Sequence, residues 1–165
     1  MPTMDVTRHE GLHPAVGAYL SALDLGRSRL INSIKNLSPE QLEQRPAGFK
    51  NSIATLVVHC AATEVSFAHR IMGKPVPEEL LAEFPPHKEE LLPVITGETA
   101  ESLQAKLQKS RAILQEAVKG LTAADLTRVI QPAPDRSYTV EWLLALLPVH
   151  LMGHVGHIQM IRQHQ

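Results

Sequence analysis

The chain of 165 residues has little cysteine, few aromatic residues and almost no net charge. Cys60 is its single cysteine, so no disulfide can form within the chain. Aromatic residues make up 4%, too few for the stacking platform that binds single-stranded nucleic acid. The formal charge of −1 gives no global field that would recruit a nucleic acid. We therefore expect no nucleic-acid partner.

Long hydrophobic runs are also lacking. No apolar run approaches the roughly 20 residues that cross a bilayer, and the N-terminus lacks the charged-then-apolar pattern of a signal peptide. These absences predict a cytoplasmic protein with no membrane partner. No internal repeat, low-complexity tract or linker divides the sequence, so we expect one domain that spans residues 1–165.

Apolar residues recur at the three- and four-residue spacing of helices, whereas the alternation typical of strands is nearly absent. Ser38-Pro39-Glu40-Gln41 is a strong helix start, and Thr122-Ala-Ala-Asp125 indicates a brief extra turn of helix. Pro132-Ala-Pro134-Asp-Arg136 predicts a turn. Four long helices are expected, at about residues 14–36, 51–72, 99–119 and 139–164.

Residues 73–97 separate the second and third long helices and contain five prolines. This stretch is too long for a tight hairpin and has room for about one helical turn. Four long helices in a chain of this length form a bundle most simply. The sequence therefore predicts an all-α fold, a four-helix bundle with a long crossover connection between helices 2 and 3.

Histidine is abundant: the chain has nine, and three fall within His150-Leu-Met-Gly-His154-Val-Gly-His157. With about 100° between helical neighbours, His150 and His154 share the stripe that Leu147 and Leu151 mark as core-facing, and His157 lies at its margin. An imidazole removed from water without partners forfeits hydrogen bonds worth roughly 1–3 kcal/mol. Two such rings one turn apart can coordinate one metal ion from the same side.

A metal site needs a third protein ligand from another helix, and His59 is the best candidate. It lies in the middle of the second long helix, and the residues on its own face are small: Thr55, Ala62, Thr63 and Ser66. Such a face can leave a cavity beside the ring, as an open metal position requires. The sequence therefore predicts a metal site formed by His59, His150 and His154.

Two reactive side chains near His59 point away from it. Cys60 points about 100° and Glu64 about 140° from the histidine, so we expect a buried, inert thiol and a structural or interface carboxylate. The sequence has no glycine-rich phosphate loop, nucleophile elbow or His-Glu-x-x-His motif, and it assigns no catalytic residue.

Several alternatives remain open at this stage. His157 is expected beside the metal ligands, with a role as a fourth ligand left open. Pro148 should kink the last helix, either aiming the histidines or as a tolerated bend. A core histidine cluster without a metal is a further alternative. The remaining histidines are expected to be solvated or packed against other side chains: His9, His13, His69, His87 and His164.

The sequence resembles the DinB-like (YfiT-like) superfamily of metal-binding four-helix bundles over nearly its whole length. Residues 37–46, LSPEQLEQRP, and 51–59, NSIATLVVH, are similar to the family's second-helix region. YTVEWLL, at residues 138–144, and HLMGHVGHI, at residues 150–158, resemble its closing signature. The chain departs from that signature at Val155, where arginine is common, and at His157, where glutamine is common.

The resemblance implies that His59, His150 and His154 bind one divalent ion, zinc or nickel, with water or substrate at the open position. It also implies a small-molecule substrate and a homodimer. We expect an enzyme that activates a low-molecular-weight thiol for S-transfer to a small electrophile. The alternatives are a metal-dependent hydrolase with activated water, for which His157 is the one candidate base, and a non-catalytic metal-binding bundle.

Overall fold

The computed structural model describes residue 5, residues 7–87 and residues 92–165. Four long helices dominate these residues, and the predicted all-α class is confirmed. Three short helices lie between them. The long helices are α1 (Pro14–Ile34), α3 (Ile53–Met72), α5 (Ala100–Val118) and α7 (Val140–Gln163); the short ones are α2 (Pro39–Glu43), α4 (Glu78–Glu83) and α6 (Ala123–Thr127).

The two helices that carry the candidate ligands have well-defined starts. The Ser52 hydroxyl accepts a hydrogen bond from the Thr55 backbone N–H at 3.2 Å, which caps α3. The Thr139 hydroxyl accepts from the Trp142 N–H at 3.1 Å, which caps α7. Gly73 ends α3 with a φ of +67°, a conformation that favours glycine. These local signals fix where α3 and α7 begin and where α3 ends.

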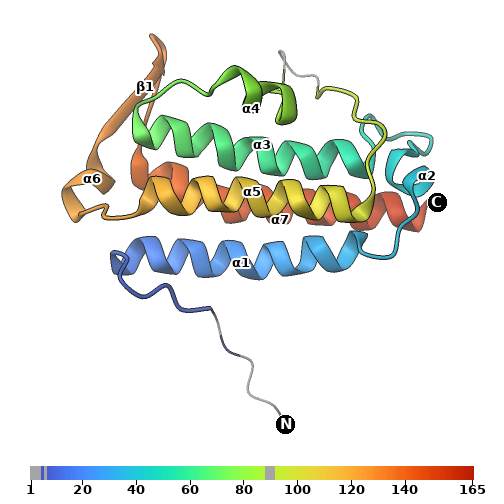
Figure 1. The fold of residues 1–165 in the computed structure, drawn as a ribbon, viewed down its shortest axis with the longest axis horizontal. Coiled ribbons are helices and arrows are strands. Elements are labelled where there is room, and N and C mark those ends of the chain that lie inside the picture. The colour runs from blue at the N-terminus through green and yellow to red at the C-terminus, as the bar shows by residue number, and fades with distance from the viewer. Residues whose placement is uncertain (1–4, 6, 88–91) are drawn as a thin grey trace.

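The long helices form an up-down-down-up bundle (Figure 1). α1 and α7 run in one direction and pack against each other, while α3 and α5 run together in the opposite direction. α3 also packs against α7. Because α3 and α5 are parallel, the chain between them must travel the length of the bundle. This confirms the predicted crossover; α4 lies within it, and residues 88–91 of the predicted connection lie outside the described residues.

A two-stranded antiparallel hairpin at one end of the bundle was not predicted. Its strands are β1 (Val129–Ala133) and β2 (Arg136–Thr139), joined by a turn at residues 134–135. The expected turn is present, but the pairing of Ile130 with Tyr138 extends it into a hairpin. The strands are short, mostly exposed and irregular between Ile130 and Ala133, so they show no alternating pattern that sequence analysis can detect.

A buried carboxylate, Glu64 on α3, joins three helices at the centre of the bundle. Its Oε1 accepts from Arg111 Nη2 of α5 at 3.3 Å and lies 3.5 Å from Arg27 Nη1 of α1. Its Oε2 accepts from the Ser110 hydroxyl at 3.3 Å. Arg111 also pairs with Asp24 of α1. The expectation that Glu64 is structural is therefore confirmed.

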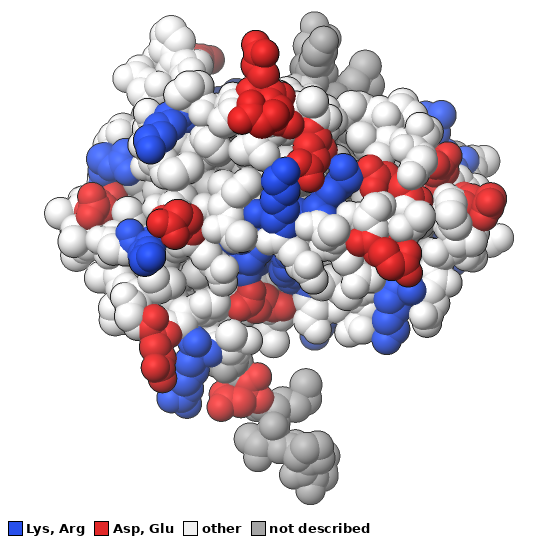
Figure 2. All heavy atoms as spheres, in the orientation of Figure 1, with Lys and Arg blue, Asp and Glu red and all other residues white. Residues whose placement is uncertain are grey.

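The surface does not concentrate charge of one sign on the face in Figure 2. Basic and acidic side chains are interspersed there, in line with the small net charge. Among the described helices, only α7 is long and apolar enough to cross a membrane by length and composition. Its residues Leu143, Leu147, Leu151 and Ile158 are buried in the bundle core, and a core helix satisfies the same composition test.

Removing the charge of Glu64 should destabilise the bundle. Glu64→Gln leaves Arg27 and Arg111 buried without their shared carboxylate, so we expect a loss of about 3 kcal/mol or more in the free energy of unfolding. Glu116→Gln on α5 is the matched control, because Glu116 and its partner Lys119 are largely exposed, and it should cost less than about 0.5 kcal/mol. Urea denaturation of both variants measures the difference; equal losses would contradict a structural role for the Glu64 charge.

Candidate metal centre

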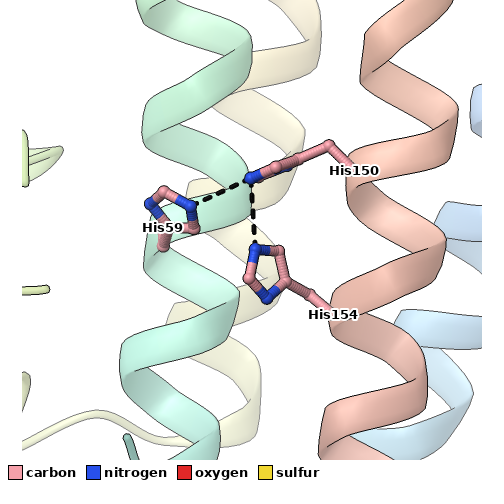
Figure 3. A group of neighbouring side chains, drawn as sticks. All are labelled: His59, His150 and His154. Carbon is pink, nitrogen blue, oxygen red and sulfur yellow. Dashed lines mark hydrogen bonds between the residues drawn. The ribbon is translucent and has the colours of Figure 1, made fainter. Parts of the chain in front are cut away.

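Three imidazoles from two helices meet at one point in the bundle (Figure 3). Nε2 of His150 lies 2.9 Å from Nε2 of His59 and 3.1 Å from Nε2 of His154. The potential ligand atoms of all three residues lie within 4.8 Å of one another. The structure therefore brings together the three histidines that the sequence singled out, and we call them the histidine triad.

The packing of α3 against α7 assembles the triad. His59 projects from the middle of α3, while His150 and His154 are stacked one turn apart on α7. α7 remains helical through Pro148, which lies between Leu147 and the first of its two triad histidines. Local helical periodicity places the two α7 rings on one face, but only the tertiary contact between helices adds His59.

Hydrogen bonding alone does not satisfy the triad. A neutral imidazole nitrogen in the ring plane carries either one hydrogen or one lone pair, so it makes one well-directed hydrogen bond. His150 Nε2 faces two such nitrogens, those of His59 and His154. Its one in-plane hydrogen or lone pair can point well at only one of them, so at most one of the two contacts is a well-directed hydrogen bond. A cation that accepts three lone pairs removes this conflict, so the donor set fits a divalent metal ion.

Burial keeps the triad histidines neutral. Desolvation lowers the pKa of His59 from 6.5 to about 3, with a smaller contribution from the neighbouring imidazoles. Desolvation also lowers the pKa of His154, to about 4, and that of His150. Neutral imidazole is the form that ligates metals. The lone pairs of the triad are therefore free for a metal ion at neutral pH without the prior loss of a proton.

Two other histidines lie close to the triad. His157 is exposed, and its ring centroid is 5.7 Å from that of His154 at an edge-on angle, outside the triad itself. His87, from the connection after α4, lies with its ring centroid 6.1 Å from that of His59. His87 is exposed, in line with the expected solvated or packing histidine, but its place near His59 was not predicted, because no local pattern relates this proline-flanked segment to α3.

A cavity of about 1200 Å³ opens beside the triad and is bordered by His59 and His150. Ala62, Thr63 and Ser66 line its α3 side, as the run of small residues predicted, whereas Thr55 is buried elsewhere. The connection after α3 contributes Val76, Leu81, Phe84 and His87 to the wall. The triad therefore lies at the border of a space large enough for a small organic molecule.

The unpredicted hairpin forms another wall of this cavity. Arg136, Tyr138 and Thr139 of β2 line it, together with Trp142 in the first turn of α7. The Tyr138 and Trp142 rings stack at 5.2 Å with an angle of 11° between their planes. In the sequence, Tyr138 and Trp142 are recognisable only as two aromatic residues four apart. Their place in the wall of the cavity that His59 borders depends on how the hairpin folds back.

Cys60 and Glu64 do not reach the triad chemistry. Cys60 is buried, and desolvation raises the pKa of its thiol, which makes it a poor nucleophile. Neither residue borders the cavity, and Glu64 is engaged by Arg27 and Arg111. The expectations of an inert thiol and of a carboxylate directed away from His59 are both confirmed.

The metal-free protein should lose stability in mildly acidic solution. His59 and His154 have folded-state pKa values of about 3 and 4, below the ordinary 6.5. The unfolded chain therefore binds protons first, and the free energy of unfolding should fall as the pH drops from 6.5 towards 4. Urea denaturation across this range should show a shallower fall for His154→Gln. His164→Gln, which removes an exposed ring, is the control; an identical slope in all three proteins would contradict the buried neutral triad.

Comparisons with known proteins agree with this architecture. The family model described as the DinB superfamily matches residues 22–158, a span that includes all three triad histidines. A solved structure, titled "Crystal structure of the conserved protein of locus from Enterococcus faecalis", is similar with a TM-score of 0.73. The two sequences are 16% identical, and the aligned region covers 88% of this chain and 94% of the chain in that structure. At this identity the likeness supports the fold alone. No curated protein matches the sequence. From the extent of the family match, this chain belongs to the DinB superfamily.

Proposed function

We propose that the protein is a metal-dependent enzyme in which His59, His150 and His154 hold one divalent ion, zinc or nickel. The observation that carries this proposal is the meeting of three neutral Nε2 atoms at the border of an open cavity. Imidazole nitrogen is a suitable ligand for both metals. Three protein ligands with space beside them are typical of catalytic sites, whereas structural zinc sites are closed by a fourth ligand.

The reaction that we favour is transfer of a low-molecular-weight thiol to a small electrophile. A bound divalent ion would lower the pKa of a thiol, so that its thiolate is available near neutral pH. The sulfur then forms a new bond to the electrophile while the bond to the leaving group breaks with its electron pair, and the thiol proton leaves with that group. Among the described residues, no Asp or Glu lines the cavity, which favours a reaction that needs no carboxylate base.

The cavity residues would position the reactants. The hydroxyls of Thr63 and Ser66 lie on the α3 wall next to His59, where they can hydrogen-bond a polar group of a bound molecule. Thr63 also donates to the His59 carbonyl at 2.9 Å, which holds its hydroxyl on that wall. Phe67, Phe84 and Trp142 supply apolar surface that excludes water from a bound substrate.

Hydrolysis by activated water is the second candidate, and one observation favours it. His87 borders the same cavity with its ring 6.1 Å from that of His59, so it is placed to exchange a proton with a bound molecule. In this version His87 replaces His157 as the candidate base, because both rings are exposed but only His87 lines the cavity. A non-catalytic bundle is disfavoured by the size of the space beside the triad.

Metal content tests the site directly. Protein purified without a histidine tag should bind one divalent ion per chain, and His150→Gln should weaken that binding by more than the roughly 10–100-fold that changes outside the ligand set cause. His157→Gln is the matched control on the same helix and should retain the ion. Elemental analysis measures the metal content, and calorimetric titration measures the affinity for the ion. Equal metal content in the wild type and His150→Gln would contradict the proposal that the triad binds the ion.

The thiol requirement separates the two reactions. Metal-loaded protein incubated with small electrophiles should consume them only when a cellular thiol is added, and chelation should abolish the turnover. His87→Gln should leave this thiol-dependent rate within about a few-fold of the wild type, because general base catalysis contributes roughly 10²–10⁴-fold where it operates. Ester turnover without any thiol, lost in His87→Gln, would instead establish the hydrolase.

A further inference from the structure

Among the described residues, those that bring permanent charge to the cavity beside the triad are all of one sign. Of the described residues that line it, Arg70 and Arg136 bear full positive charges, and none is an aspartate or a glutamate. The chain as a whole has 17 acidic and 16 basic residues, so this separation is not a consequence of composition. The charge on the cavity wall also differs from that on the face in Figure 2, where basic and acidic side chains are interspersed.

Arg70 is held against the cavity wall by aromatic side chains. It lies in the last turn of α3, and its guanidinium donates a hydrogen bond to the Tyr138 hydroxyl. The guanidinium carbon is 5.8 Å from the centroid of the Phe67 ring and 5.9 Å from that of Tyr138. A guanidinium has five N–H donors, so these contacts leave most of them available to a ligand.

Arg136 approaches the same cavity from the hairpin. It is the first residue of β2 and is exposed. Within the described part of the chain, neither Arg136 nor Arg70 forms an ion pair with a carboxylate, in contrast to Arg27 and Arg111 of the core. Two guanidiniums without a carboxylate partner that border one cavity form a site for an anionic group, because a guanidinium fork matches carboxylate or phosphate geometry.

The rest of the wall is mainly apolar. Phe67, Leu81, Phe84 and Leu146 contribute aliphatic and aromatic surface, and the stacked Tyr138–Trp142 pair lies beside them. The triad borders the cavity through His59 and His150. A ligand that fills this space therefore meets positive charge, apolar surface and the histidines.

We propose that the cavity binds a small organic anion: a carboxylate held by Arg70 and Arg136, with an apolar or aromatic body along the wall. That this molecule is the substrate, with its reacting atom directed at the triad, rests on the proposed function. The preference for an anion does not depend on the proposed function, because it arises from the two arginines. The substrate class is thus a carboxylate-bearing small molecule with an apolar portion.

Trp142 allows a direct test, since it is the single tryptophan of the chain and lines the cavity. Three probes of the same shape are titrated against its fluorescence: 4-phenylbutyrate, the neutral 4-phenylbutanamide and the cationic 4-phenylbutylamine. The protein is first stripped of metal with a chelator and dialysed, so that a carboxylate cannot bind through an ion. We expect the carboxylate to bind about fivefold more tightly than the amide at low salt, with the advantage shrinking as salt is added.

Arginine variants identify the source of the preference. Arg136→Gln should reduce the carboxylate-to-amide ratio towards one while leaving the affinity for the amide unchanged. Arg70→Gln should do the same, and circular dichroism of that variant checks that loss of the Tyr138 contact has not unfolded the hairpin end. Arg45→Gln is the control, because Arg45 is exposed between α2 and α3 and does not line the cavity.

Each outcome decides the proposal. Tighter binding of the amine or amide than of the carboxylate, an unchanged ratio in both cavity variants, or no fluorescence response to any probe would overturn it. The result is separable from the test of the metal site. A carboxylate preference in a protein that binds no metal would support the anion site and contradict the metal-dependent enzyme. One metal ion per chain without a carboxylate preference would support the metal site and contradict the anion site.

Discussion

The fold depends on the way α3 is held on two sides. Glu64 binds Arg27 and Arg111 on one face of the helix, and His59 meets α7 on a different face about 140° away. Breaking a buried ion pair leaves an uncompensated charge, so α1, α3 and α5 have little freedom to shift relative to one another. α7 then packs against α1 and α3 with His150 and His154 directed at His59. Glu64, which does not border the cavity, thus helps to fix the helix that carries the candidate metal ligand His59.

The triad is unfavourable for folding for the same reason that it suits a metal ion. Three partly buried imidazoles with depressed pKa values keep their lone pairs free, yet they cannot all hydrogen-bond to one another. A ligand that binds only the folded state recovers this cost as binding free energy. The polar cluster borders a cavity rather than lying in the close-packed core, so the ion would face both the protein and a substrate.

In the proposed enzyme, the irregular segments around this rigid centre would contribute substrate recognition. The hairpin supplies Arg136 and Tyr138, and the connection between α3 and α5 supplies Phe84 and His87. Connections tolerate change better than packed helices do, and binding residues are commonly found on them. The candidate metal ligands therefore lie on the bundle helices, whereas much of the cavity wall lies on the connections between them.

The sequence by itself determined the helices, the crossover and the pairing of His150 with His154, because helical period and capping are local properties. It also indicated His59, through the small residues on its face. Tertiary structure decided what surrounds these rings. The hairpin strands are too short and exposed to show alternation, and His87 and Arg136 lie far from His59 along the chain. Their places depend on how distant segments pack, a property that no local period encodes.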